Sequence, residues 1–322
     1  MNVLEIAGLT KRFGTKTVID HMDLSIPPHS VFGFIGQNGA GKTTTMKMIT
    51  GLLKPDGGTI RVCGEKVTFG SNKTSRWIGY LPDVPEFYGY MTAAQYLALC
   101  GEITGMEREN LREASGRLLE LVGLADSRGC IRHFSRGMKQ RLGIAQALLN
   151  GPRLLICDEP TSALDPVGRK EILDILASVK DQTTVLFSTH VLSDVERICD
   201  HAALLSGGRI AVQGTLEELK TRRNKESNRS ARAEHSLRRP YEKIVAKETL
   251  QIEFQTEKDL QQFRVRYPSG EAVDRTTIRL PGDAYEDMSS ILSDLAQNHV
   301  PVRKLELLEP TLEDLFLEVT AQ

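Results

Sequence analysis

Residues 36–44, which read GQNGAGKTT, decide the fold of this chain. They fit the spacing G-x-x-x-x-G-K-[ST], with Gly36 and Gly41 at the fixed glycine positions, followed by Lys42 and Thr43. The apolar segment VFGFIG before them predicts a buried strand, and the segment KTTTMKMITGLL after them predicts a helix that ends at a glycine. Because this motif requires a strand, a glycine loop and a helix in that order, the sequence predicts a phosphate-binding loop.

The chemistry of this loop points to a nucleoside triphosphate. Its glycines allow backbone N–H groups to turn toward an anion, and the N-terminus of the next helix adds the positive end of its dipole. Lys42 supplies a positive charge for the β- and γ-phosphates, and the Thr43 hydroxyl can ligate Mg²⁺. We therefore expect the chain to bind a nucleoside triphosphate.

The composition is that of an ordinary globular protein. The chain has 322 residues, enough for about two domains, and a formal net charge of −1 that argues for neither nucleic acid nor an anionic membrane. Its five cysteines are scattered singly, which predicts a reduced, cytosolic chain. The amino terminus lacks a signal-peptide pattern and no window approaches 18 apolar residues, so we expect any membrane role to come through a partner.

The pattern along the chain predicts three regions. Residues 1–219 alternate strands and helices, with a helical insert from Thr92 to about Leu124 and a hairpin whose turn is expected at Gly57 and Gly58. Residues 220–240 are rich in Arg, Lys, Ser and Asn and are expected to form an exposed basic linker. An alternative for this linker is contact with acidic lipid headgroups or an acidic partner.

Residues 241–322 predict a small accessory domain with the order β-α-β-α-β. Its last strand is expected in VRKLELLEP and its last helix in TLEDLFLEVT, capped by Thr311. No catalytic combination of residues is evident in this region.

Two further segments carry candidate catalytic residues. Asp158 and Glu159 end the apolar segment RLLICDEP, and His190 ends TTVLFSTH, and both segments predict buried parallel strands. If Asp158 and Glu159 point to opposite faces of the strand end, one carboxylate can address Mg²⁺ while the next reaches the attacking water. We assign Asp158 to the metal, Glu159 to general base, and His190 to orienting water and donating to the γ-phosphate.

The segment FSRGMKQR predicts a second anion site. Ser135 precedes a helix that Gly137 is expected to open, so Ser135 can act as the N-cap of that helix or offer its hydroxyl outward. A small residue at a bare helix N-terminus favours an anion. Because residues 36–44 already supply one phosphate site, the second is expected to complete the nucleotide site of another copy.

Taken together, residues 1 to about 220 resemble the nucleotide-binding subunit of an ATP-binding cassette (ABC) transporter. GQNGAGKTT is similar to the Walker A motif and LLICDEP to Walker B; SALD, at 162–165, is similar to the D-loop. His190 is similar to the switch histidine, and Phe13 falls where an aromatic residue stacks on adenine. The resemblance implies an α/β P-loop NTPase core with an antiparallel β subdomain and a helical subdomain, followed by the small C-terminal α/β domain.

The resemblance also implies function and partners. It implies hydrolysis of ATP to ADP and phosphate with Mg²⁺, in a head-to-tail dimer with a second copy or a paralogous subunit. That dimer would drive an integral membrane permease seated on the helical insert, which places the chain in the cytoplasm at the inner face of the cell membrane. No nucleic-acid partner is implied. The implied site residues fall into three sets: catalytic Lys42, Glu159 and His190; ATP-binding Phe13, Gly36, Asn38, Gly39, Ala40, Gly41, Lys42, Thr43, Thr44, Ser135 and Gly137; and metal-binding Thr43, Asp158 and Asp83.

The sequence departs from the family pattern at two places. The family signature reads L-S-G-G-Q, and here Phe134, Arg136 and Met138 replace its first, third and fifth residues. Asp83, in IGYLPD, stands where many members carry a Gln that ligates Mg²⁺. Both features, and the C-terminal run LEPTLEDLFLEVT, resemble the branch that includes antibiotic, multidrug and sodium exporters, which favours export.

Three other functions remain as alternatives. An importer ATPase is the nearest, and Asp83 and the C-terminal run argue against it. A non-transport ABC ATPase acting on nucleic acid, the ribosome or cofactor assembly usually carries two cassettes, a coiled coil or zinc fingers, none of which is evident. A regulatory cassette without turnover is disfavoured by the intact Asp158, Glu159 and His190.

Overall fold

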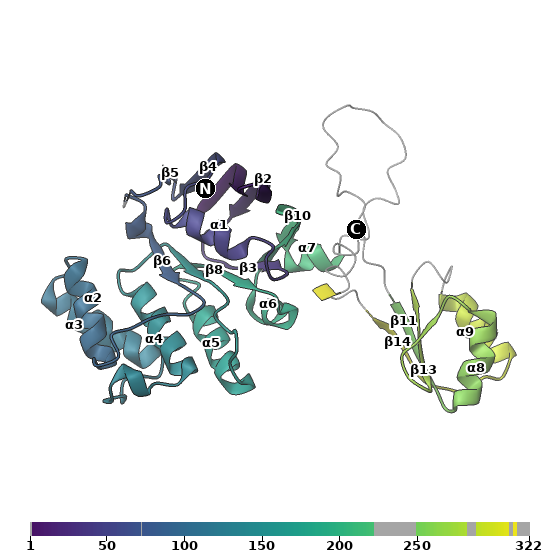
Figure 1. Cartoon of the computed structure of the whole chain (residues 1–322). Coiled ribbons are helices and arrows are strands. Elements are labelled where there is room, and N and C mark those ends of the chain that lie inside the picture. Colours follow the sequence, from purple (N-terminus) through teal and green to yellow (C-terminus); the bar gives the residue numbers. More distant parts are fainter. Residues whose placement is uncertain (1, 72, 222–248, 282–287, 309–311, 314–322) are drawn as a thin grey trace. The chain divides into compact units, whose positions relative to one another are not determined.

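A computed structural model describes residues 2–71, 73–221, 249–281, 288–308 and 312–313. The chain divides into two compact units, the first ending at Leu216 and the second beginning at Glu217 (Figure 1). Nearly all of the predicted basic linker and most of the predicted final helix lie outside the described residues. No described helix is long and apolar enough to cross a membrane.

A six-stranded, mostly parallel sheet forms the centre of the first unit, in the order β10-β9-β3-β8-β7-β6. Its central strand, β3, is buried along its whole length because β8 and β9 pair with it on both sides. The strands predicted in RLLICDEP and TTVLFSTH are β7 and β8, which pair in parallel. The strands are β3 (Val31–Gly36), β6 (Ile78–Leu81), β7 (Leu154–Cys157), β8 (Thr184–Thr189), β9 (His201–Ser206) and β10 (Arg209–Thr215).

An antiparallel sheet of order β2-β1-β4-β5 packs with helix α1 and the central sheet around one core. Its strands are β1 (Leu4–Phe13), β2 (Lys16–Ile26), β4 (Gly57–Val62) and β5 (Glu65–Lys66). The expected turn at Gly57 and Gly58 is wrong: these glycines begin β4, and the hairpin turns at Cys63 and Gly64. Gly58 is required by packing, because a Cβ there would lie 2.5 Å from the backbone of Gly8 on the neighbouring strand.

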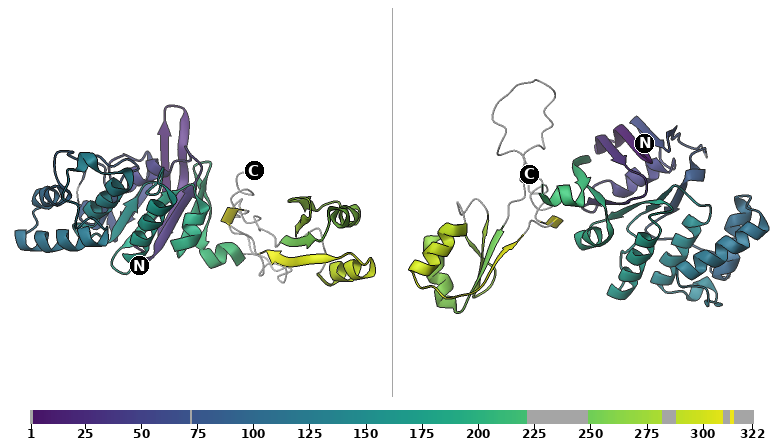
Figure 2. Two further views of the ribbon diagram at one scale, coloured as in Figure 1. Left: turned by 90° about the horizontal axis from the view of Figure 1, so that it is seen from below. Right: turned by 180° about the vertical axis from the view of Figure 1, so that it is seen from behind.

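The helices of the first unit include the predicted insert, which forms two helices, α2 and α3, that lie side by side at one end of the unit (Figures 1 and 2). Thr92 starts α2 with a capping box, exchanging hydrogen bonds with Gln95. Asp165 caps α5 in the same position, ahead of a proline at the first helical residue. The helices are α1 (Lys42–Ile49), α2 (Ala93–Ile103), α3 (Arg108–Leu121), α4 (Arg136–Leu148), α5 (Pro166–Ser178) and α6 (Leu192–Ile198). A further helix, α7 (Leu216–Thr221), begins at the last residue of this unit.

The second unit has the order β-α-β-β-α-β, one short strand more than the sequence predicted. The extra strand β12 spans only two residues, too few for an alternating pattern to mark it in the sequence. The sheet order is β12-β13-β11-β14, and α8 and α9 cover one face of it, where Phe254 and Phe263 are buried (Figure 1). The elements are β11 (Thr249–Phe254), α8 (Glu257–Arg266), β12 (Glu271–Ala272), β13 (Thr277–Pro281), α9 (Met288–Gln297) and β14 (Val302–Leu308).

Candidate active site

The phosphate-binding loop joins β3 to α1 and holds Lys42 at the first position of that helix. Gly41 precedes it with a φ of 109°, and a Cβ there would lie 2.6 Å from Ile19 Cδ1, so only glycine fits without displacing its neighbours. The Lys42 ammonium is buried and donates hydrogen bonds to the carbonyl oxygens of Gly36 at 2.7 Å and Gln37 at 3.3 Å. The strand, loop and helix predicted from residues 36–44 are confirmed.

Glu159 joins the phosphate loop to the end of strand β8. Its Oε1 lies 3.0 Å from Lys42 Nζ and its Oε2 lies 2.9 Å from His190 Nδ1. An ionised carboxylate only accepts hydrogen bonds, so His190 carries its proton on Nδ1, which leaves Nε2 available to a ligand. The side chain of His190 is 46% exposed, whereas that of Glu159 is 14% exposed. The three residues predicted as catalytic therefore lie in one cluster.

Asp158 and Glu159 are separated by a tight backbone turn and not by strand alternation, as the sequence suggested. Strand β7 ends at Cys157, so both carboxylates follow it, and Glu159 adopts a left-handed backbone with φ 46°. This turn directs Glu159 toward Lys42 while Asp158 is buried beside β8. The two carboxylates thus occupy different surroundings, as their proposed roles require.

Ser188, on β8, contacts both of these acidic residues, and the sequence reasoning missed it. Its hydroxyl donates to Asp158 Oδ1 at 2.7 Å and accepts from the backbone N–H of Glu159 at 2.9 Å. Ser188 is fully buried in a strand whose every residue is buried. A polar residue in such a strand is the signal that could have found it, because a buried hydroxyl without partners is costly.

The donors near this cluster suit magnesium. Mg²⁺ prefers oxygen ligands and is usually held by one or two carboxylates, substrate phosphates and water. Asp158 supplies a carboxylate, and Thr43 supplies an exposed hydroxyl one residue after Lys42. Within the described part of the chain, no group of three or more His, Cys, Asp or Glu side chains is arranged to hold a metal by itself. The residues therefore fit a cation that is shared with a nucleotide.

The signature segment starts helix α4. Ser135 is the N-cap, as predicted, and its Oγ accepts from the Met138 N–H at 3.2 Å, although the helix begins at Arg136 and not at Gly137. A Cβ built on Gly137 would lie 3.8 Å from Leu164 Cδ2 and 4.0 Å from Ser135 Oγ, both ordinary contact distances. Ser135 and Gly137 lie on an element separate from the Lys42–Glu159–His190 cluster, and none of the hydrogen bonds found among described residues joins them to it.

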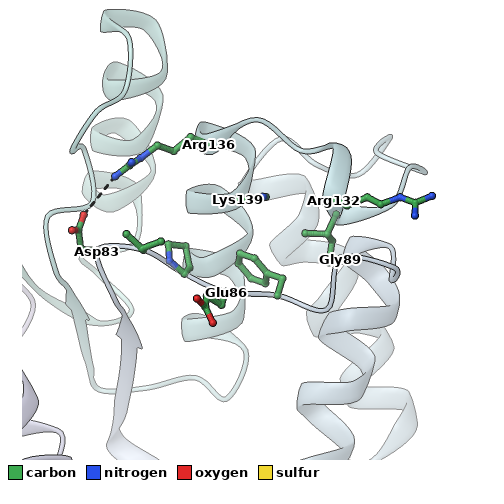
Figure 3. Close-up of a pocket in the computed structure, with 10 residues that line it drawn as sticks. Asp83, Glu86, Gly89, Arg132, Arg136 and Lys139 are labelled. Atoms are coloured by element: carbon green, nitrogen blue, oxygen red, sulfur yellow. Dashed lines mark ion pairs between the residues drawn. The ribbon is translucent and has the colours of Figure 1, made fainter.

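The two departures from the family pattern contact each other. Asp83 follows β6, and its Oδ1 lies 3.6 Å from an Arg136 guanidinium nitrogen (Figure 3). Gln140 Nε2 donates a hydrogen bond to the Asp83 carbonyl oxygen at 3.1 Å. Burial, with the nearby Asp158 and Glu159 carboxylates, raises the pKa of Asp83, and Arg136 opposes that rise. In this structure Asp83 therefore faces the signature helix.

Phe13, the candidate adenine-stacking residue, is the last residue of β1. Its side chain is about half exposed, and the Lys11 ammonium lies 5.3 Å from the centre of its ring. An accessible aromatic ring at a strand end can accept a base on its face.

Comparison with known proteins points to one family. The family model described as "ABC transporter" matches residues 19–162. The chain is 44% identical over 219 residues to an uncharacterised ABC transporter ATP-binding protein of Bacillus subtilis, covering 68% of this chain and 72% of that protein. It is 38% identical to the bacitracin transport ATP-binding protein of Bacillus licheniformis, covering 69% of this chain and 73% of that protein.

A further relative spans nearly the whole chain. The daunorubicin/doxorubicin resistance ATP-binding protein of Streptomyces peucetius is 31% identical, covering 98% of this chain and 92% of that protein. Among solved structures, an ATP-binding subunit of an ABC transporter superposes with a TM-score of 0.62 at 32% identity, covering 68% of this chain and 92% of that one.

The fold and the site define a P-loop ATPase of the cassette type. The chain belongs to the ATP-binding proteins of ABC transporters, and it is the ATP-hydrolysing subunit of such a transporter.

Proposed function

We propose that this subunit energises export of a substrate through a separate membrane permease. The observation that carries the proposal is Glu159, whose side chain is only 14% exposed and contacts both Lys42 and His190, so that the three candidate catalytic residues lie together. The names of relatives concerned with bacitracin transport and drug resistance support the direction of transport. The chain would work at the inner face of the cell membrane, held there by the permease.

Each residue of the cluster has a proposed role in hydrolysis. Lys42, with the N–H groups of the loop, binds the β- and γ-phosphates, and Thr43 and Asp158 hold Mg²⁺, which would neutralise charge on the phosphates. Glu159 accepts a proton from the attacking water, and His190 uses Nε2 to orient that water or to contact the γ-phosphate. Because Glu159 pairs with Lys42 in this structure, an arriving phosphate would compete for the ammonium and release the carboxylate toward water.

The remaining roles lie outside this cluster. Phe13 would stack on the adenine ring, Gly36, Asn38, Gly39, Ala40, Gly41 and Thr44 would line the phosphates, and Asp83 would assist the metal through water. Ser135 and Gly137 would contact the γ-phosphate held by a second copy or a paralogue. Dimerisation with a second copy is supported by the N-terminus of α4, which Ser135 caps and where Gly137 leaves room for an anion. This candidate anion site is separate from the chain's own phosphate loop.

The groove between residues 83–89, which follow β6, and the first turn of α4 is the proposed seat of the permease. It has a volume of about 470 Å³, and its apolar lining residues include Val84, Pro85 and Phe87. Figure 3 shows the charged residues around it. Three basic residues, Arg132, Arg136 and Lys139, line the groove together with Asp83 and Glu86. The basic side of the groove would favour a partner segment that carries acidic residues. A short amphipathic helix on the cytoplasmic side of a permease matches this combination of apolar and basic residues.

The proposal is tested by capture followed by reconstitution. A tagged Glu159→Gln chain is loaded with Mg-ATP in its native host, extracted in mild detergent, and its partners are identified, with the nucleotide-free chain as control. A polytopic membrane protein that is retained with ATP is then reconstituted with the wild-type chain in vesicles. ATP-dependent movement of substrate away from the side bearing the ATPase supports export. Movement toward that side, or recovery of soluble assemblies alone, would contradict it.

A further inference from the structure

We propose that Ser188 is a positioning residue for ATP hydrolysis, which sets both the metal-binding carboxylate and the general base with a single hydroxyl. The inference rests on the roles proposed above for Asp158 and Glu159. Ser188 would touch neither the nucleotide nor the metal; it would act through the two acidic residues that do.

The direction of both hydrogen bonds is fixed by chemistry. A backbone N–H can only donate, so the Ser188 oxygen must accept from Glu159. An ionised carboxylate can only accept, so the hydroxyl proton must point toward Asp158. Ser188 therefore cannot rotate to serve one residue without losing the other, and its single orientation links the two carboxylates.

The first of these bonds holds an unfavourable backbone conformation. Glu159 has a φ of 46°, which residues other than glycine adopt rarely, and such residues persist where the surroundings determine them. The Glu159 N–H that points to Ser188 belongs to this left-handed residue. Without its acceptor, the turn is free to relax, and the Glu159 side chain would leave Lys42 and His190.

The second bond orients Asp158. This carboxylate is almost fully buried, and its backbone N–H is already used by the carbonyl of Leu81 on β6. With one oxygen held by Ser188, the other oxygen is free to turn toward the cation. Donors that hold a metal-binding carboxylate in this way typically contribute about 10–100-fold to metal affinity or activity.

The location of Ser188 argues against a purely structural role. Strand β8 is buried along its whole length, and a hydroxyl there costs free energy unless it is hydrogen-bonded. An apolar residue would fill the same place with no such requirement. Both partners of this hydroxyl belong to the candidate site, so the polar residue is explained by that site.

The test compares two pairs of variants with matched shape. Ser188→Ala removes the hydroxyl and is compared with the wild type. Ser188→Thr and Ser188→Val have side chains of similar size, but only the threonine carries a hydroxyl. We expect Ala and Val to lower kcat by about 10–100-fold and to raise the Mg²⁺ concentration needed for half-maximal turnover. Thr should recover most of the turnover. Ser178→Ala, which removes a hydroxyl bonded only within α5, is the control.

Two further measurements separate the possible results. ATP affinity is measured by equilibrium binding, once in EDTA and once in Mg²⁺. The variants should bind ATP more weakly than the wild type only when Mg²⁺ is present. A general loss of structure would weaken ATP binding in both conditions. Wild-type turnover in Ser188→Ala, or equal turnover in the Thr and Val variants, would overturn the inference. Glu159→Gln is measured beside them: if it stays active, the proposed role of Glu159 fails, whatever Ser188 does.

Discussion

Replacing Glu159 with glutamine tests the centre of the site with the least change in shape. The glutamine keeps an oxygen that can accept from Lys42, but it cannot accept a proton from water. Its amide nitrogen also cannot accept from His190 Nδ1–H, so that contact must rearrange. The substitution therefore removes the base while leaving the phosphate loop and its lysine in place.

The expected magnitude follows from these contacts. A positioned general base contributes about 10²–10⁴-fold, which corresponds to about 2.7–5.4 kcal/mol of activation free energy. In the wild-type chain an ATP phosphate must compete with the Glu159 carboxylate for Lys42. Because the neutral amide competes less and does not repel phosphate, we expect Glu159→Gln to bind ATP at least as tightly as the wild type.

The assay measures phosphate release at saturating Mg-ATP together with ATP affinity by equilibrium dialysis. Glu113→Gln is the matched control, because Glu113 pairs with Arg117 on the exposed face of α3, away from the Lys42–Glu159–His190 cluster. Its charge should therefore be lost without effect on the site. Turnover of Glu159→Gln within tenfold of the wild type would refute the assignment of Glu159 as base. Loss of ATP binding would instead show that the ion pair with Lys42 supports the loop itself.

Three other predictions concern packing and cysteine chemistry. A Cβ on Gly79 would lie 2.1 Å from the Ala147 carbonyl oxygen, so Gly79→Ala should lower the free energy of unfolding, measured by urea titration, by about 1–3 kcal/mol. The control is Gly116→Ala, whose Cβ would lie in open space on α3 and should not lower that free energy. Burial raises the pKa of the Cys157 thiol, so this thiol should not react with iodoacetamide at pH 8 until the chain is unfolded. Mass spectrometry detects the modification, and labelling of Cys157 in the native protein would contradict the prediction. Phe263→Ala should destabilise the second unit by about 3–5 kcal/mol and speed hydrogen exchange of the β11 amides; unchanged exchange would place the core of that unit elsewhere.

The sequence was most informative where a motif encodes its own local structure. Residues 36–44 specify a loop whose glycines and lysine act within a few positions of one another, so spacing alone predicts β3, the loop and α1. The strands β7 and β8 were equally clear, because strands buried on both faces of a parallel sheet read as continuous apolar runs. Short or irregular features were not predicted correctly. Strand β12 has only two residues and was not expected, and the hairpin turn at Cys63 was expected at a nearby pair of glycines.

Contacts between distant segments could not be read from the sequence. Asp83 was expected as a metal-binding residue and Arg136 only as a departure from the family signature, and their pairing depends on how β6 and α4 pack. The motifs predicted that Lys42, Glu159 and His190 act at one site. The contacts of Glu159 with both of the other side chains are visible only in the fold. Spacing identifies which residues participate, and packing determines which of them touch.

Ser188 and Glu159 share a property that explains why the sequence concealed their relation. Each breaks a local rule: Glu159 takes a left-handed backbone without being glycine, and Ser188 places a hydroxyl in a wholly buried strand. Taken separately, each feature lowers the stability of the fold, and the neighbouring residues in the sequence do not offset that cost. The hydrogen bond between them satisfies the buried hydroxyl and holds the strained residue at once. Departures of this kind persist at functional sites because the surrounding fold supplies the stability that they lack. The hydrogen bond joins a residue of β8 to the turn after β7, and the pair is best explained by the chemistry that it positions.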